Sequence, residues 1–272
     1  MPWTKTFLTG FIMFLGLQVA ARADPLAYMV TTDKDFGTID LATGDFSSEG
    51  FESVQLAGLG EIGSTLYGVN YAAGTGTLYT IDTVNGSLTT VGTDTAVAYE
   101  AFGSTLTNLY AIGENNVGAF ELYSVNSSDG SPTLLGLTGL TPGGDYSLST
   151  NSGTLYFTDG ADLYTLDTTT GAATSVGATG AGGPGFGALV TENGLLYGGQ
   201  YSSPTAVDTL NTTTGAATFV SDLSGTSSSF AGLAPDVPTA TPEPVNVSVL
   251  LLGFLAAGIW IKVRRQTAAD RG

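Results

Sequence analysis

The feature that most constrains the fold of this chain is a phrase that recurs five times along its middle. Each copy has aromatic or aliphatic residues, then Asp or Asn, three further residues, Gly, and a stretch rich in Thr and Val. The Asp or Asn positions are Asp40, Asp82, Asn126, Asp167 and Asn211. They lie 42, 44, 41 and 44 residues apart. A period of about 43 residues is typical of one four-stranded blade of a β-propeller.

The segments within each repeat have the chemistry of β-strands. A Leu-Tyr pair precedes the Asp or Asn of four repeats, and a further small, apolar segment precedes each pair. The segments are 4 to 6 residues long, rich in Val, Thr, Tyr and Leu, and bounded by Gly, Asn or Ser. The sequence therefore predicts an all-β fold over Asp24–Pro238, a five-bladed β-propeller with about 43 residues in each four-stranded blade.

The two ends of the repeat region complement each other. The first repeat lacks the small apolar segment that begins each of the others, and an additional copy, Phe230–Ala234, follows the fifth repeat. We expect this C-terminal strand to pair with the first blade, because a closed ring leaves no exposed sheet edge at the junction.

The repeated Asp or Asn and Gly predict a tight turn between two antiparallel strands. The Asp or Asn side chain accepts hydrogen bonds from backbone N–H groups two residues further on, and Gly adopts a positive φ at low cost. A ligand site repeated around the ring is the alternative interpretation of the same residues.

Composition excludes most catalytic chemistry. The chain has no Cys and no His, so disulfides, thiolate nucleophiles and imidazole general bases are ruled out. Of its 24 acidic residues, 22 lie between Asp24 and Ala240, where Lys34 is the only base. A domain with a net charge of about −21 repels nucleic acid and anionic lipid, so neither is expected as a partner.

The N-terminal 23 residues predict a secretory signal peptide. Lys5 provides the positive start, and residues 7–19 form an apolar run of 13 residues. A small-x-small sequence ends at Ala23, so the mature chain is expected to begin at Asp24.

The C-terminus predicts a second targeting segment. A linker, residues 239–244, contains the motif Pro242, Glu243, Pro244, and residues 245–272 provide an apolar helix followed by a basic tail. Hydropathy alone predicts a membrane anchor whose trailing cations stay in the cytoplasm.

This order of parts, with Arg264 and Arg265 after the helix, resembles the PEP-CTERM sorting signal of Gram-negative bacteria. The resemblance covers about 30 residues, from Pro242 to the end. It implies a membrane protease-transpeptidase, an exosortase, as the processing partner, and an association with exopolysaccharide. The implied route is export, transient anchoring in the inner membrane, and release to the cell surface or the extracellular space. The tail departs from the pattern, because residues 266–272 continue past the Arg pair.

Two carboxylates are the candidate chemical groups of the propeller centre. Residues that lead the innermost strands should point toward the central channel, and Glu100 and Asp145 are the acids among them. With the neighbouring Tyr99 and Tyr146 they could bind a sugar, or cleave one with a carboxylate pair. Ordinary polar residues at strand ends are the alternative interpretation.

The dispersed acids also raise the question of a metal. Oxygen ligands favour Ca²⁺, and the closest local groups are Asp33 with Asp35, and Asp159 with Asp162. General solubility outside the cell explains the same acids without a metal. No other cofactor is expected.

Two hypotheses about function follow. The first is an exported, exosortase-processed protein of the cell surface or extracellular matrix, a non-enzymatic binding or structural module associated with exopolysaccharide. The second is a secreted carbohydrate-active enzyme that uses Glu100 and Asp145. The sorting signal favours the first, because it specifies an address and no reaction.

Overall fold

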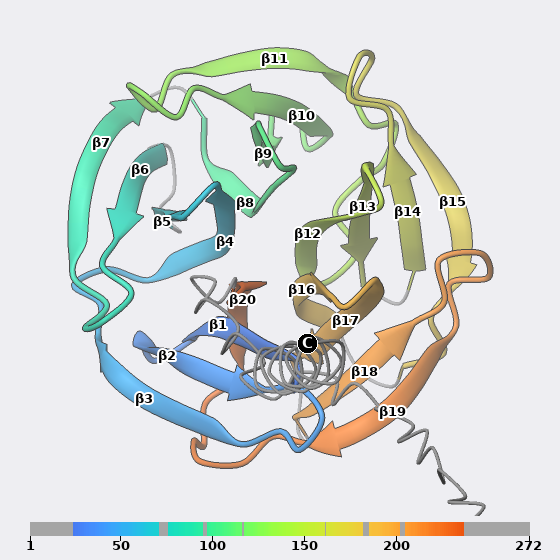
Figure 1. The fold of residues 1–272 in the computed structure, drawn as a ribbon. Coiled ribbons are helices and arrows are strands. Elements are labelled where there is room, and N and C mark those ends of the chain that lie inside the picture. Colours follow the sequence, from blue (N-terminus) through green and yellow to red (C-terminus); the bar gives the residue numbers. More distant parts are fainter. Residues whose placement is uncertain are drawn as a thin grey trace, which may run out of the picture.

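The chain folds into short strands arranged around one central axis (Figure 1). A computed structural model describes residues 24–70, 76–94, 97–115, 117–160, 162–181, 185–201 and 205–236. These ranges contain 20 β-strands and no helix, which confirms the predicted all-β class. No helix able to span a membrane occurs in the described ranges, and both predicted targeting segments lie outside them.

The strands fall into sets of four, and each set runs outward from the axis (Figure 1). The first set is β20 (Phe230–Pro235), β1 (Leu26–Thr31), β2 (Asp35–Asp40) and β3 (Phe46–Phe51). The second is β4 (Leu56–Ile62), β5 (Thr65–Asn70), β6 (Gly76–Ile81) and β7 (Leu88–Asp94). The third is β8 (Tyr99–Ser104), β9 (Leu109–Glu114), β10 (Phe120–Val125) and β11 (Pro132–Leu137).

Two further sets complete the described strands. One is β12 (Tyr146–Asn151), β13 (Thr154–Asp159), β14 (Asp162–Leu166) and β15 (Ala173–Ala178). The other is β16 (Phe186–Glu192), β17 (Leu195–Gln200), β18 (Ala206–Leu210) and β19 (Ala217–Asp222). A parallel bridge between Gly58 of β4 and Phe102 of β8 joins the second and third sets into one eight-stranded sheet.

The C-terminal strand closes onto the first set, as the sequence predicts. β20 pairs antiparallel with β1, with Met29 opposite Leu233 and Tyr28 opposite Ala234. β20 also packs against β4 on one side and β16 on the other. The last strand of the described chain therefore lies at the centre of the molecule, beside the first.

The repeated Asp and Asn residues are turn residues, as predicted. Oδ1 of Asp167 accepts a hydrogen bond of 2.7 Å from the backbone N–H of Thr169, and Gly171 has φ +78°. Equivalent bonds are accepted by the side chains of Asp40, Asp82, Asn126 and Asn211. Each side chain thus satisfies an N–H of its own turn, which accounts for the repeat without a ligand.

The core is divided into five hydrophobic clusters, each built by two neighbouring sets. In one of them, Phe230 and Met29 of the first set pack with Val207 of β18, and all three side chains are fully buried. Apolar contacts between sets, rather than hydrogen bonds, therefore hold most of the ring together.

One carboxyl group is buried at the edge of this core. Glu52, which follows β3, is 4% exposed, and its backbone N–H donates a 2.9 Å hydrogen bond to the carbonyl of Lys34. Neither carboxylate oxygen has a hydrogen-bond partner among the described residues. Burial raises the pKa of Glu52 to about 8, because water no longer solvates the ionised form.

This carboxyl group should make the protein less stable as pH rises. Unfolded Glu52 ionises near pH 4.5, whereas the folded state keeps the proton up to about pH 8, so stability is lost across that interval. We expect the Glu52→Gln variant to have a higher Tm than the parent at pH 8.5 and the same Tm near pH 4. The gain should be several degrees, since about 1 kcal/mol shifts Tm by roughly 2–4 °C at this size.

Thermal melts across this pH range test the prediction. The exposed Asp222 on β19 provides the control, and Asp222→Asn should leave the pH dependence of Tm unchanged. Equal Tm values for Glu52→Gln and the parent at every pH would contradict the burial of a protonated carboxyl group.

Candidate functional site

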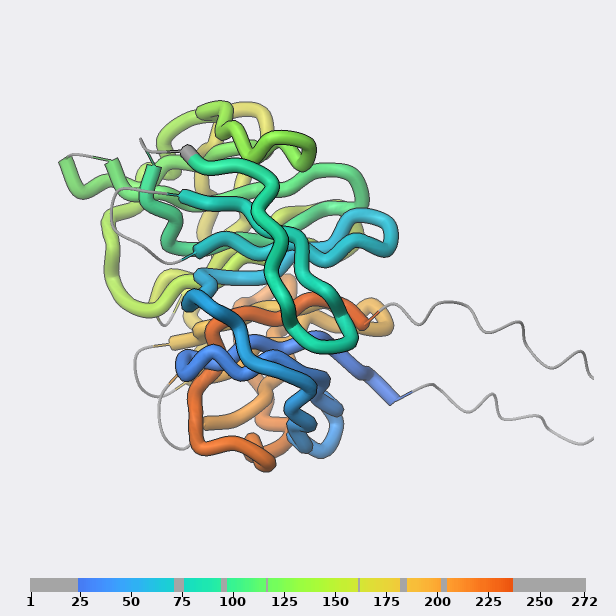
Figure 2. The backbone as a smooth tube through the Cα atoms, turned by 90° about the vertical axis from the view of Figure 1, so that its left-hand side faces the viewer, coloured from blue at the N-terminus to red at the C-terminus, as the bar shows by residue number. Residues whose placement is uncertain are grey.

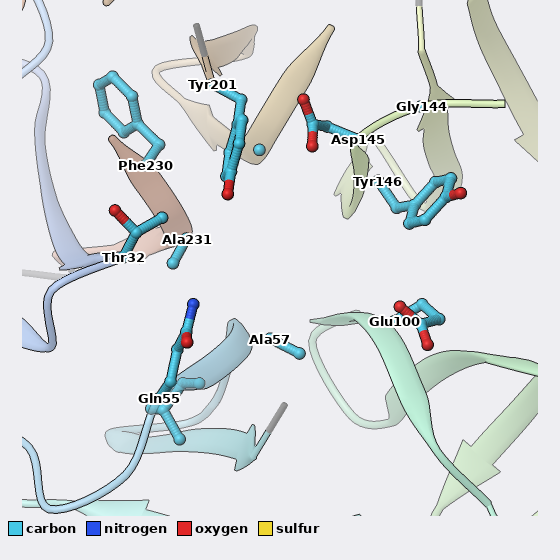
Figure 3. Close-up of a pocket in the computed structure, with 12 residues that line it drawn as sticks. Thr32, Gln55, Ala57, Glu100, Gly144, Asp145, Tyr146, Tyr201, Phe230 and Ala231 are labelled. Carbon is cyan, nitrogen blue, oxygen red and sulfur yellow. The ribbon is translucent and has the colours of Figure 1, made fainter. Parts of the chain in front are cut away.

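A cavity opens on the central axis at the end where the innermost strands begin. Its volume is about 360 Å³, within the range of small-molecule binding sites. Figure 3 shows carboxylate, hydroxyl, amide and aromatic side chains around it. Both predicted carboxylates, Glu100 and Asp145, line this cavity, and they are the acids among its lining residues.

A recurring irregularity of the inner strands aims side chains into the cavity. In β8, Tyr99 pairs with Gly113 and Ala101 with Ile112, so Glu100 has no residue opposite it. Such a bulge interrupts the alternation of side chains and redirects the extra residue. The register shifts at the same place in β4, β16 and β20, where they include the cavity-lining residues Ala57, Gly187 and Ala231.

Asp145 reaches the cavity in a different way, because it lies directly before β12. The N–H of Gly160 donates a 3.0 Å hydrogen bond to the Asp145 carbonyl, which fixes the backbone there. Oδ2 of Asp145 is buried and has no hydrogen-bond partner among the described residues. Burial raises the pKa of Asp145 to about 6, and burial together with the Glu114 charge raises the pKa of Glu100.

Tyr99 and Tyr146, the sequence neighbours of these two acids, lie in different environments. Tyr99 is 1% exposed and packs in a hydrophobic cluster with Phe102, outside the cavity lining. Successive residues of a strand point to opposite faces, so Tyr99 enters the core where Glu100 enters the cavity. Tyr146 does line the cavity, and its ring packs edge-on against Phe120 with the ring centroids 4.7 Å apart.

The wall opposite the carboxylates is uncharged, and the sequence did not reveal most of it. Thr32, Gln55 and Phe230 line that side, and Tyr201 extends it toward Asp145 (Figure 3). Tyr201 is 40% exposed, and its N–H donates a 3.1 Å hydrogen bond to the Gly185 carbonyl. Tyr201 follows β17, the second strand of its set. It reaches the cavity because β17 runs antiparallel to β16, so the end of β17 lies beside the start of β16. The repeat period alone does not reveal this.

The predicted Ca²⁺ ligands form pairs rather than a coordination shell. Asp159 and Asp162 are partners across β13 and β14, and Asp159 also accepts a backbone hydrogen bond. Asp33 accepts a hydrogen bond from the hydroxyl of Ser228, and Asp35 lies at the start of β2. No group of three or more metal-ligating side chains occurs among the described residues, and Ca²⁺ binding stays a prediction.

A second cavity, of about 540 Å³, lies at the other end of the innermost strands, where Glu61, Leu233 and Pro235 line it. Glycines bring the strands together between the two cavities. A Cβ atom on Gly187 would lie 2.4 Å from the carbonyl oxygen of Phe230. The void between the strands at this waist has a volume of about 10 Å³. The acidic cavity is therefore a blind pocket, closed at its base.

Both ends of the described chain leave the molecule on one side (Figure 2). Pro235, near the end of β20, lines the second cavity, and its partner in β1 is Ala27. The acidic cavity lies at the opposite end of these two strands, at Thr32 and Phe230. The segments that continue toward both termini therefore start from the end of the axis remote from the acidic cavity.

Comparison with known proteins gives a likeness of fold alone. No protein-family model and no curated protein match the chain. A chain of a nidogen/laminin complex is similar to it with a TM-score of 0.52, 13% identity, and coverage of 78% of this chain and 81% of that chain. The sets of four strands around one axis define the architecture as β-propeller-type.

Two other similar structures are β-propeller-type proteins. One is a glutaminyl cyclase of Myxococcus xanthus, with a TM-score of 0.44, 17% identity, and coverage of 77% of this chain and 74% of that chain. The other is a regucalcin of Agrobacterium tumefaciens, described as a calcium-binding protein, with a TM-score of 0.43, 19% identity, and coverage of 74% and 71%.

Proposed function

We propose that this protein is an exported, exosortase-processed β-propeller that binds saccharides of the extracellular matrix in its acidic cavity, without catalysing a reaction. The observation that carries the proposal is the blind cavity on the axis, which combines two carboxylates with hydroxyl, amide and aromatic groups. Such mixed linings are the usual chemistry of small-molecule sites.

The propeller we propose has five blades. Five clusters unite neighbouring sets of strands, and the innermost strands contact one another in the cyclic order β20, β4, β8, β12, β16. The single parallel bridge between β4 and β8 then marks close approach of two blades rather than one larger sheet. This count agrees with the sequence period of about 43 residues.

The direction in which the chain ends leave supports a tethered binding module. A C-terminal anchor that begins beyond Asp236 would hold the protein by the end remote from the acidic cavity. The cavity would then face away from the membrane during export and sorting. The signal peptide, the Pro242, Glu243, Pro244 motif and the basic tail support this route by their resemblance to the PEP-CTERM signal.

A secreted carbohydrate-active enzyme is the second candidate, because Glu100 and Asp145 line one cavity and could form a carboxylate pair. Among the described residues of the lining, no third acid and no Arg completes a glycosidase-like pocket, which favours binding over catalysis.

The mass of the intact protein from its producing cells tests the export route. We expect a chain that begins at Asp24 and ends near Pro244, since both targeting segments would have been removed. A mass that matches all 272 residues would contradict both processing steps. A mass that lacks residues 1–23 but retains residues 245–272 would contradict exosortase processing and indicate a permanent anchor.

A further inference from the structure

We propose that the acidic cavity selects saccharides with free, protonated amino groups, and that it rejects acetylated and anionic ones. This inference rests on the proposed saccharide-binding function and names the ligand class of that site. It is carried by the distribution of charge around the cavity, by one buried carboxylate oxygen without a partner, and by the uncharged wall opposite.

The charge around the cavity is of one sign and on one side. Glu100 and Asp145 line it, and the charges of Glu114 and Asp159 act on this region, where both raise the pKa of Tyr146. These residues belong to the third and fourth sets of strands. The described residues of the lining include no base, so a cationic group entering the cavity would meet only attraction from them on that side.

Lys34, the one base among the described residues, does not neutralise the negative charge at the cavity. Lys34 is exposed, lies in the turn between β1 and β2, and is absent from the cavity lining. Asp33 and Asp35 flank it in the sequence and offset its charge. A saccharide with carboxylate, sulfate or phosphate groups would therefore bring negative charge to a negative site without a cation to pair with.

The described protein does little to offset the charge of Asp145. Its Oδ2 atom is buried and has no hydrogen-bond partner among the described residues, so a cation in the cavity would supply compensation that the protein itself does not. An ammonium group offers three donors and a full charge, and such charge-assisted bonds are roughly twice as strong as those between neutral groups. An acetylated amine offers one N–H without charge, and its methyl group would replace donors that face the carboxylates.

The opposite wall suits the body of a sugar ring. Tyr201 presents a partly exposed aromatic face with a hydroxyl at its tip, and Thr32 and Gln55 add hydrogen-bonding groups (Figure 3). An aromatic ring of this kind accepts the apolar face of a ligand and bonds its polar edge. An amino sugar can thus place its ring on this wall while its amine reaches Glu100 and Asp145.

Binding should depend on pH in a defined direction. The titratable groups at this end are Glu100, Asp145, Tyr146, Tyr201, Glu114 and Asp159, and burial raises the pKa of Asp145 to about 6. A carboxyl group must be ionised to pair with an ammonium group. Affinity for an amine-bearing saccharide should therefore rise above pH 5 and fall again at higher pH, where the sugar amine loses its proton.

Calorimetric titration of the purified mature protein with three hexasaccharides tests the inference. The probes are the glucosamine hexamer, its fully N-acetylated form and a galacturonate hexamer, at low salt and pH 6, where the amines retain their protons. We expect the glucosamine hexamer to bind at least tenfold more tightly than the acetylated one, and the galacturonate hexamer not to bind. Added salt should reduce the preference, because it screens charges at the cavity mouth.

Variants distinguish an effect of this cavity on binding from an effect of the domain's net charge. Asp145→Asn should remove most of the preference for the amine. Asp129→Asn, in the exposed turn between β10 and β11, should retain the preference although it also removes one carboxylate, since hydrogen bonds from Ser131 keep the pKa of Asp129 low. Glu100→Gln is the substitute if circular dichroism shows that Asp145→Asn does not fold.

The possible results distinguish this inference from the function on which it rests. Equal or tighter binding of the acetylated hexamer would overturn selection by charge and leave a saccharide-binding module. Equal loss of preference in Asp129→Asn would also overturn it, because the effect would then come from net charge. No binding of any hexasaccharide would overturn the proposed function itself.

Discussion

Deletion of Phe230–Ala234 is expected to abolish folding, and Phe230→Ala is expected to lower the free energy of unfolding by about 3–5 kcal/mol. The deletion removes most of β20, the strand that pairs with β1 and packs against β4 and β16. It would expose the inner edges of three sets of strands at once. The effect of a short deletion is large because the segment joins the two ends of the ring.

The packing around Phe230 explains the size of the single-residue effect. Phe230 is fully buried, and a Cβ atom on Gly199 would lie 2.3 Å from its ring. The neighbouring strand therefore leaves room for an aromatic ring and for little else. Removal of the ring leaves a cavity that rigid strands on both sides cannot fill.

Urea unfolding followed by circular dichroism measures both changes. Phe219→Ala is the matched control, because Phe219 lies on the outer strand β19 and is 60% exposed. That variant should change the free energy of unfolding by no more than about 0.5 kcal/mol. An unaltered urea unfolding curve after the deletion would show that β20 does not close the ring.

The double variant Glu100→Gln, Asp145→Asn is expected to abolish saccharide binding and at the same time to stabilise the fold at neutral pH. Both carboxyl groups have raised pKa values because they are partly buried, with the Glu114 charge adding to the effect at Glu100, so their ionised forms cost folding free energy above about pH 6. The amides carry no charge and fit the same space. Binding and stability should therefore change in opposite directions.

Three measurements on this variant separate the two proposed functions. Binding of the glucosamine hexamer should fall at least tenfold, Tm should rise at pH 8 and equal that of the parent near pH 4, and neither protein should release reducing sugar. Hydrolysis by the parent that is lost in the variant would contradict a purely binding role and establish the carbohydrate-active enzyme.

A second pair of substitutions controls for charge. Glu61→Gln with Glu192→Gln changes the net charge by the same amount at the far end of the innermost strands. Burial and neighbouring carboxylates also raise the pKa of both residues, and that of Glu61 reaches about 7. This control should therefore also raise Tm at pH 8, and it should leave saccharide binding intact.

The candidate site shows how far sequence reasoning extends. Glu100 and Asp145 could be predicted because they begin segments whose period had been recognised, and both line the cavity. Tyr99 could not be separated from Glu100, since a bulge decides which of two neighbours faces the axis. Tyr201 was missed because it follows a different strand of its set.

The sequence by itself determined the strand content, the period and the turns. These features depend on local chemistry: short β-favouring segments, an Asp or Asn that binds the next turn, and a Gly with positive φ. The sequence also predicted the pairing of Phe230–Ala234 with β1. The first repeat lacks its small apolar segment and an additional copy follows the fifth repeat, so the additional copy can complete the first set of strands.

Only the tertiary structure decided the closed waist, the blind cavity and the burial of Glu52. Each depends on residues that are distant in the sequence, such as Gly187 against Phe230, or Lys34 beside Glu52. A repeat period places strands around an axis, but it does not state how closely they approach. The packing distance between strands determines where space and unpaired charge remain, and therefore what the protein can bind.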